Sequence, residues 1–179
     1  RHLDTVLLKW QMNLESIAQI FCDDILPVFD LPAAWVGRAE KDGRLTLLAT
    51  AEGREKGFLD PLRESSLRWD GEPTCCLPTG AVIRSGHRQI VSLDTLACQS
   101  CSAVCHASGM PQAAIILPLS LRGVTWGVLT FYGHNARQFE TPQLPLHLAA
   151  IAGRLGASLE SALQQEWLTL LDTALAGVD

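Results

Sequence analysis

Two β-rich segments in the second half of the chain constrain its fold more than any other feature. They cover residues 113–121 and 125–132, with the tripeptide Arg122-Gly123-Val124 between them. Runs rich in β-branched and aromatic residues on both sides of a short glycine-containing turn are typical of a β-hairpin. We therefore expect a central hairpin here, in a sheet whose other strands are predicted at residues 33–38, 45–51 and 89–93.

Both ends of the chain are predicted to be amphipathic helices. In residues 3–29, apolar side chains recur at three- and four-residue steps or at whole turns, and Pro27 and Pro32 are expected to close the helix. Residues 143–175 carry a seam close to a heptad repeat, formed by Leu144, Leu148, Ile151, Leu155, Leu159, Ala162 and Leu170. A helix of that length cannot pack wholly against so small a domain, so we expect its far end to project and to pair with another helix.

Between these elements the sequence predicts one short helix and one irregular stretch. The helix is expected to begin near residue 77 and to end at Ser85-Gly86, since glycine commonly terminates helices. Residues 52–73 are polar and read as irregular.

Composition limits the classes of partner. The chain has 179 residues, of which 47% are hydrophobic, which is enough for one domain with a proper core. Its net charge is −5 without a cluster of Lys or Arg, so we expect no nucleic-acid partner. No apolar run is long enough to span a bilayer and no export signal is present, so we expect no membrane partner and a cytoplasmic location.

The cysteines are the strongest sign of a specific function. Three of the six lie in the run Cys98-x2-Cys101-x3-Cys105-His106, and a Cys75-Cys76 pair lies upstream. Thiols packed this densely usually bind a metal, carry a cofactor or change redox state. Thiolates suit zinc and iron–sulfur clusters, and the spacing does not decide between them. A thiol–disulfide switch and a set of inert, buried thiols are the alternatives.

In element order and in several motifs, the chain resembles a GAF domain. The part of the chain that resembles the family's middle helix and strand is Pro78-Thr79-Gly80-x2-Ile83-Arg84-Ser85-Gly86, followed by Ile90-Val91-Ser92-Leu93-Asp94. The part that resembles the family's hairpin signature is Ile115-Ile116-Leu117-Pro118-Leu119-x3-Gly123-x2-Trp126-Gly127-Val128-Leu129. Phe139 and residues 144–159 resemble the family's closing helix. The resemblance covers residues 8–163 and implies an α+β fold. This fold has a six-stranded antiparallel sheet, helices on both faces and long terminal helices.

The resemblance also implies a domain organisation and a role. Residues 1–30 would be an N-terminal helix packed on the domain, residues 31–160 the GAF core, and residues 161–179 a signalling helix leading to an output domain that the sequence lacks. Most members of the family are non-catalytic regulatory modules beside PAS, histidine kinase, or cyclic-di-GMP synthesising and degrading domains. We expect such a sensor, with its output domain in the same chain and a homodimer formed through the terminal helices.

Placed on that fold, residues 94–110 form the lid of a ligand pocket, and Cys75 and Cys76 lie at another edge of the cavity. The resemblance implies a four-thiolate site for an iron–sulfur cluster or zinc, made by Cys98, Cys101, Cys105 and one of Cys75 or Cys76. His106 is a candidate fifth ligand or an alternative to Cys105, and Trp126 a candidate pocket residue. No catalytic residues are predicted.

Two other functions stay open. A dimerisation and relay module without a cofactor would make the cysteines incidental. A thiol-based methionine sulfoxide reductase is the enzymatic alternative, because a few proteins of this fold carry out that chemistry. Covalent haem and a bilin are disfavoured by the spacings around Cys105-His106, and the residue set of cyclic-nucleotide-binding GAF domains is absent.

Overall fold

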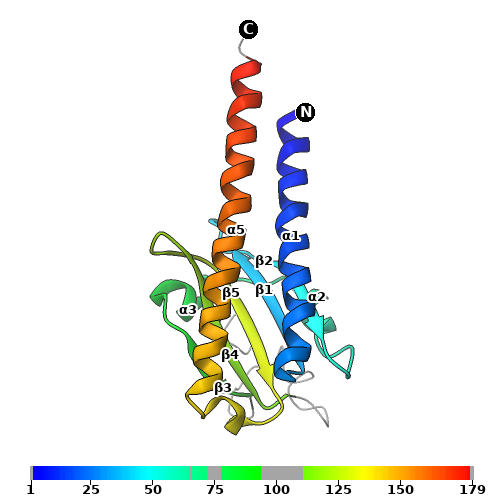
Figure 1. Ribbon diagram of the computed structural model, residues 1–179, viewed down its shortest axis with the longest axis vertical. Coiled ribbons are helices and arrows are strands. Elements are labelled where there is room, and N and C mark those ends of the chain that lie inside the picture. Colours follow the sequence, from blue (N-terminus) through cyan, green and yellow to red (C-terminus); the bar gives the residue numbers. More distant parts are fainter. Residues whose placement is uncertain (1, 65, 72–77, 94–110, 178–179) are drawn as a thin grey trace.

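The computed structural model (Figure 1) describes residues 2–64, 66–71, 78–93 and 111–177. Its helices and strands are arranged around one sheet. In chain order they are α1 (His2–Phe29), β1 (Ala33–Ala39), β2 (Leu45–Glu52), α2 (Asp60–Glu64), α3 (Thr79–Ser85), β3 (Gln89–Ser92), β4 (Ala113–Leu121), β5 (Val124–Gly133), the 3-10 helix η2 (Ala136–Phe139) and α5 (Gln143–Ala176).

The sheet is antiparallel throughout, with strand order β2-β1-β5-β4-β3. The predicted hairpin is confirmed as β4 and β5, joined by a turn in which Arg122 and Gly123 both have positive φ. The expectation of six strands is wrong for the described residues, which form five. The stretch 52–73, predicted to be irregular, contains the short helix α2 and a β-bridge between Arg44 and Arg68.

A different set of buried side chains covers each face of the sheet, because successive residues of a strand point to opposite faces. The helix-side cluster lies under α1 and α5 and consists of Leu14, Ala18, Cys22, Leu26, Leu31, Ala34, Val36, Leu48, Ala49, Ala51, Ala113, Ile115, Leu117, Leu119, Leu129, Phe131, Phe139, Leu148, Ala152, Leu155, Leu159 and Ala162. The α3-side cluster consists of Ala33, Trp35, Leu45, Phe58, Leu59, Leu67, Val82, Ile83, Leu93, Ala114, Ile116, Val128 and Tyr132.

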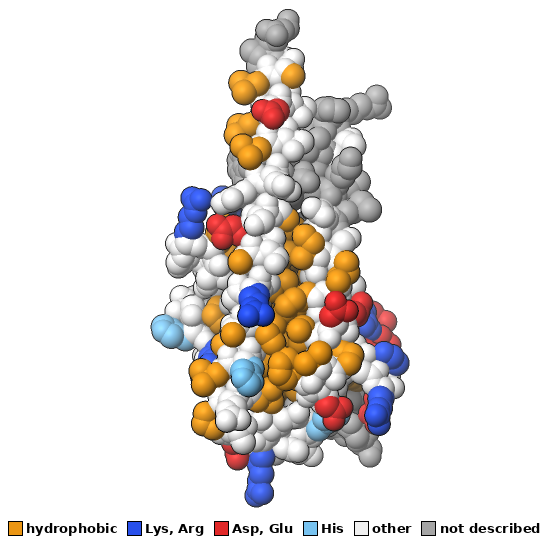
Figure 2. Space-filling view, in the orientation of Figure 1, with side chains coloured by type: hydrophobic (Ala, Val, Ile, Leu, Met, Phe, Trp, Pro, Cys, Tyr) orange, Lys and Arg blue, Asp and Glu red, His pale blue; other side chains and the backbone are white. Residues whose placement is uncertain are grey.

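The two long helices run side by side along one face, and both extend past the sheet in the same direction (Figure 1). Each buries one stripe, which in α1 follows four-residue steps from Leu14 to Leu26. Figure 2 shows apolar side chains gathered along the seam between α1 and α5. In the C-terminal part of α5, three leucines are exposed: Leu168, Leu171 and Leu175.

The C-terminal end of α1 differs in detail from the prediction. Pro27 lies inside the last turn, and the helix ends two residues later at Phe29. Asp30 then adopts a left-handed conformation with φ 50°, and the Leu31 N–H donates to the Leu26 carbonyl oxygen at 3.3 Å. This left-handed ending satisfies one of the free carbonyls of the last turn and directs the chain into β1.

Within the described ranges, no helix combines the length and the apolar character needed to cross a bilayer.

Candidate functional site

The predicted cysteine site lies outside the described residues. Cys75, Cys76, Cys98, Cys101, Cys105 and His106 all belong to the two segments 72–77 and 94–110. Among the residues that the structure does describe, no group of three or more His, Cys, Asp or Glu side chains is placed to hold a metal ion. The four-thiolate site and its metal therefore stay a prediction.

The described residues fix where these two segments join the fold. Segment 94–110 connects Leu93 to Pro111, and the Leu93 N–H donates to the Gln112 carbonyl oxygen at 2.8 Å, so the described residues on either side of the segment are held together. Leu93 is buried in the α3-side cluster. Segment 72–77 ends at Pro78, directly before α3, whose Val82 and Ile83 belong to the same cluster. Both segments thus join the fold at the α3 side of the sheet.

The α3 side of the sheet contains buried polar groups as well as apolar ones. The Trp35 indole Nε1–H donates to the Tyr132 hydroxyl at 3.1 Å. The Phe58 and Tyr132 rings pack edge to face, with their centroids 5.5 Å apart. The hydroxyl oxygens of Thr79 and Thr130 are fully buried and have no hydrogen-bond partner among the described residues. Leaving a buried hydroxyl unpaired costs about 1–3 kcal/mol, so these two groups are available to pair with a ligand.

Trp126 lies on the other side of the sheet. Simple alternation along β5 would place it with Val128 and Tyr132 in the α3-side cluster. The register between β4 and β5 shifts at this point, however, because Leu119 pairs with Gly127 and the next pair is Ser120 with Thr125. A bulge of this kind turns the extra side chain to the opposite face. Trp126 accordingly packs against the helix-side cluster, and its Nε1 has no hydrogen-bond partner among the described residues.

Cys22 is the cysteine that the structure describes, and it is a core residue on α1. Its side chain is fully buried in the helix-side cluster. Burial, with a smaller contribution from the charge of Asp23, raises the pKa of the Cys22 thiol to about 12. A thiol in that environment stays protonated and unreactive at neutral pH.

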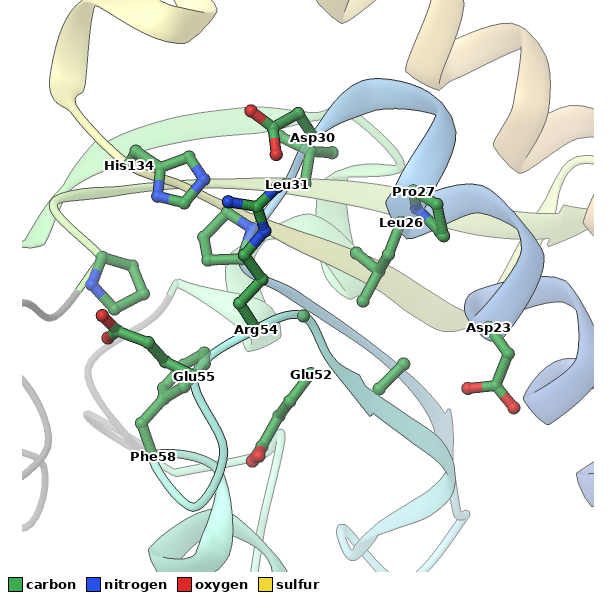
Figure 3. A pocket seen from close by; sticks show the side chains of 14 residues that line it. Asp23, Leu26, Pro27, Asp30, Leu31, Glu52, Arg54, Glu55, Phe58 and His134 are labelled. Atoms are coloured by element: carbon green, nitrogen blue, oxygen red, sulfur yellow. The ribbon is translucent and has the colours of Figure 1, made fainter.

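A cleft that the sequence analysis missed lies between the C-terminal end of α1 and the connection that follows β2 (Figure 3). Its volume is about 580 Å³. Its lining is Asp23, Leu26, Pro27, Asp30, Leu31, Pro32, Ala51, Glu52, Gly53, Arg54, Glu55, Phe58, Pro111 and His134. The only signal in the sequence was the charged run Arg54-Glu55-Lys56 between two glycines, which by itself predicts a solvated loop.

Glu52 holds the loop that forms one wall of this cleft. Its side chain is only 4% exposed, and its carboxylate accepts hydrogen bonds from the backbone N–H groups of Gly57 at 2.5 Å and Leu59 at 3.0 Å. The Arg63 guanidinium lies 3.3 Å from the same carboxylate. Gly57 has φ +97°, a conformation that other residues rarely adopt, so the loop turns sharply around the carboxylate.

Comparisons with known proteins agree on the fold. Residues 11–160 match the family model described as GAF domain. The structure is similar to the GAF domain region of a Geobacter sulfurreducens PCA protein, with a TM-score of 0.63, 19% identity and coverage of 86% of this chain and 97% of that one. It is also similar to the second GAF domain of DevS from Mycobacterium smegmatis, with a TM-score of 0.62, 12% identity and coverage of 87% and 99%.

A third similar structure is an enzyme. It is the type II free methionine-R-sulfoxide reductase from Thermoplasma acidophilum, with a TM-score of 0.62, 12% identity and coverage of 85% of this chain and 95% of that one. At these identities the three likenesses show the fold and no activity. No curated protein sequence matches the chain.

Proposed function

The chain belongs to the GAF domain family, whose members are generally regulatory modules of sensor proteins, and we propose that it is the ligand- or redox-sensing domain of a signal-transduction protein. In this proposal the cysteine cluster holds an iron–sulfur cluster or zinc, and the domain itself is not catalytic. The output domain in the same chain is a histidine kinase or an enzyme that makes or degrades cyclic-di-GMP.

One observation supports the proposal: the points where the cysteine segments join the fold and the two long helices lie on opposite faces of the sheet. The segments with the cysteines join the fold at the α3-side cluster, through Leu93 and Pro78. The two long helices, which extend past the sheet, pack on the opposite face. Strands β4 and β5 contribute side chains to both clusters. On β4, for example, Ile116 belongs to the α3-side cluster and Ile115 to the helix-side cluster. A change on the cysteine side would therefore reach the helices through a rigid, close-packed layer.

The chemistry of the donor set supports a metal. Four thiolates are the ligands of structural zinc and of most iron–sulfur clusters. In the proposal these are Cys98, Cys101, Cys105 and one of Cys75 or Cys76, with His106 as an alternative ligand. The unpaired hydroxyls of Thr79 and Thr130 support a bound group on this side of the sheet.

The helices supply the output of the proposed sensor. Ile20 and Val28 on α1 and Leu146 on α5 are exposed by 63%, 71% and 58%, and the projecting part of α5 exposes three leucines. Such surfaces are typical of helices that pair in a homodimer. A ligand shifts the signal only if it binds one arrangement of the paired helices better than the other.

Metal content of protein purified without air tests the proposal. We expect iron with acid-labile sulfide, or zinc, at one site per chain, and we expect Cys101→Ser to lower it sharply. Cys22→Ala is the matched control, since Cys22 lies in the helix-side cluster and should leave the metal content unchanged. Metal-free protein whose cluster thiols react freely and do not respond to oxidant would refute the sensing role.

The exposed leucines of α5 favour a second function, a dimerisation and relay module with no cofactor. Its signature would be a stable dimer in metal-free protein, measured by analytical ultracentrifugation. Turnover of free methionine-R-sulfoxide with thioredoxin would instead identify the enzymatic alternative.

A further inference from the structure

We propose that the cleft between α1 and the β2–α2 connection is a second binding site, and that its ligand is a linear organic cation such as a diamine or a polyamine. None of the described residues that line the cleft belongs to the predicted cysteine site, and its walls come mainly from the end of α1 and from residues 51–55. The inference therefore goes beyond the sensing function proposed above and stands or falls independently of it.

The shape of the cleft suits a small molecule. Its volume of about 580 Å³ lies within the range of ordinary small-molecule sites, roughly 300–1,000 Å³. More than half of the inner surface is apolar, and Leu26, Leu31, Ala51 and Phe58 contribute to it at the edges of the two core clusters. An alkyl chain placed against this surface would be largely removed from water.

The charges around the cleft favour a cation. Asp23, Asp30 and Glu55 are exposed carboxylates on its rim, whereas Arg54 is the single Lys or Arg side chain among the described residues of the lining. Among the described residues, Asp30 and Glu55 have no ion-pair partner within 4.0 Å. The C-terminal end of α1, which carries the negative end of the helix dipole, adds to the same field.

The arrangement of the carboxylates favours a cation with more than one ammonium group. In Figure 3, Asp23 and Glu55 lie toward opposite ends of the cleft, Asp30 lies on a third side, and Leu26 and Arg54 lie between them, with the Arg54 guanidinium directed toward the Asp30 side. A chain of methylene groups ending in ammonium groups matches this order, since its stem covers the apolar surface while its ends meet carboxylates. Glu52 is excluded as a contact, because its carboxylate is engaged by Gly57, Leu59 and Arg63 and points away from the other side chains.

Binding at this cleft would act on the position of α1. The Gln19 side-chain amide donates to the Asp23 carboxylate at 3.1 Å and to the Thr50 carbonyl oxygen at 2.8 Å, and it accepts from the Thr50 N–H at 3.3 Å. Gln19 thereby fixes the register of α1 along β2. An ammonium group that engages Asp23 competes with the first of these hydrogen bonds, so the ligand would change how α1 is held on the sheet.

Calorimetric titration of the 179-residue chain with spermidine tests the site. We expect saturable binding that weakens as salt is raised, and about tenfold weaker binding to the double variant Asp30→Asn/Glu55→Gln, which loses two charge contacts. Its matched control is Glu140→Gln/Asp172→Asn, which removes the same charge from exposed positions outside the cleft. We expect the control to bind as the unaltered chain does, and Arg54→Ala to bind a few-fold more tightly.

Three results would overturn the proposal. Equal weakening in the cleft and control variants would show that spermidine responds only to net charge. Binding of glutarate that is lost in Arg54→Ala would make the cleft an anion site. If spermidine slowed amide hydrogen exchange in other parts of the chain but not in residues 53–58, the ligand would lie outside the cleft. Loss of metal in Cys101→Ser with spermidine binding intact would separate this site from the proposed sensor.

Discussion

The buried carboxylate of Glu52 is predicted to be the strongest single attachment of the loop between β2 and α2. In Glu52→Ala, the N–H groups of Gly57 and Leu59 lose an acceptor 2.5 Å and 3.0 Å away, and Arg63 loses a partner. A hydrogen bond to a charged group contributes about 1.5–3 kcal/mol, but Gly57 is half-buried and water can replace part of the loss. We therefore expect the free energy of unfolding to fall by about 3 kcal/mol.

Urea unfolding followed by tryptophan fluorescence measures this change. For a domain of this size, 1 kcal/mol corresponds to about 3 °C in melting temperature, so thermal unfolding should shift down by about 10 °C. Glu52→Gln keeps the shape and one carbonyl acceptor, and we expect it to cost about half as much.

Glu64→Ala is the matched control, because Glu64 is an exposed carboxylate on α2, a few residues along the same loop region. We expect this variant to change the free energy of unfolding by no more than about 0.5 kcal/mol. If Glu52→Ala cost no more than Glu64→Ala, the carboxylate would not hold the loop and the reasoning would be wrong.

Further predictions concern the packing of the sheet and its buried groups. Gly127→Ala should lower stability by about 1–3 kcal/mol in urea unfolding, because its Cβ would overlap the carbonyl oxygen of Gly37, whereas Gly153→Ala, in open space on α5, should raise it by up to about 1 kcal/mol. Cys22 should resist iodoacetamide in the native protein at pH 8. The pKa of the Cys22 thiol is about 12 in the folded protein, above its unfolded value, so the buried neutral thiol contributes fully to stability below about pH 9 and this contribution is lost as pH rises toward 12. Cys22→Ala should remove that loss from the pH profile of the free energy of unfolding. Thr130→Val should leave the free energy of unfolding of ligand-free protein unchanged or slightly higher, since the hydroxyl has no partner among the described residues. If this variant lost as much stability as one that removes a hydrogen-bonded threonine hydroxyl, the assignment would be wrong.

The elements of the fold could be predicted where a local pattern and its boundary residue coincide. Strand β4, the turn at Gly123 and strand β5 follow from two β-rich runs on either side of a short glycine-containing turn. Helix α3 ends at Ser85 because Gly86, at φ 69°, adopts the left-handed conformation that closes a helix. These signals lie within a few residues of each other, so one sequence is enough to read them.

Features that depend on distant contacts could not be predicted in the same way. The bulge that turns Trp126 to the helix side is visible only in the pairing of β5 with β4. The cleft beside Glu52 forms because the end of α1 meets the end of β2 in space. Neither feature produces a periodic pattern in the sequence. The predicted cysteine site lies in segments outside the described residues.

The hydrogen bonds of Gln19 also bear on how copies of the chain can meet. Strand β2 is one margin of the sheet, and the outward-facing backbone groups of Thr50 would otherwise be open to a strand from another molecule. The Gln19 amide occupies both, in the manner of a neighbouring strand, while the opposite margin, β3, is only four residues long. Addition of a strand from another molecule, a route to aggregates, is thus hindered at Thr50 on β2, and among the described residues β3 offers only a short edge.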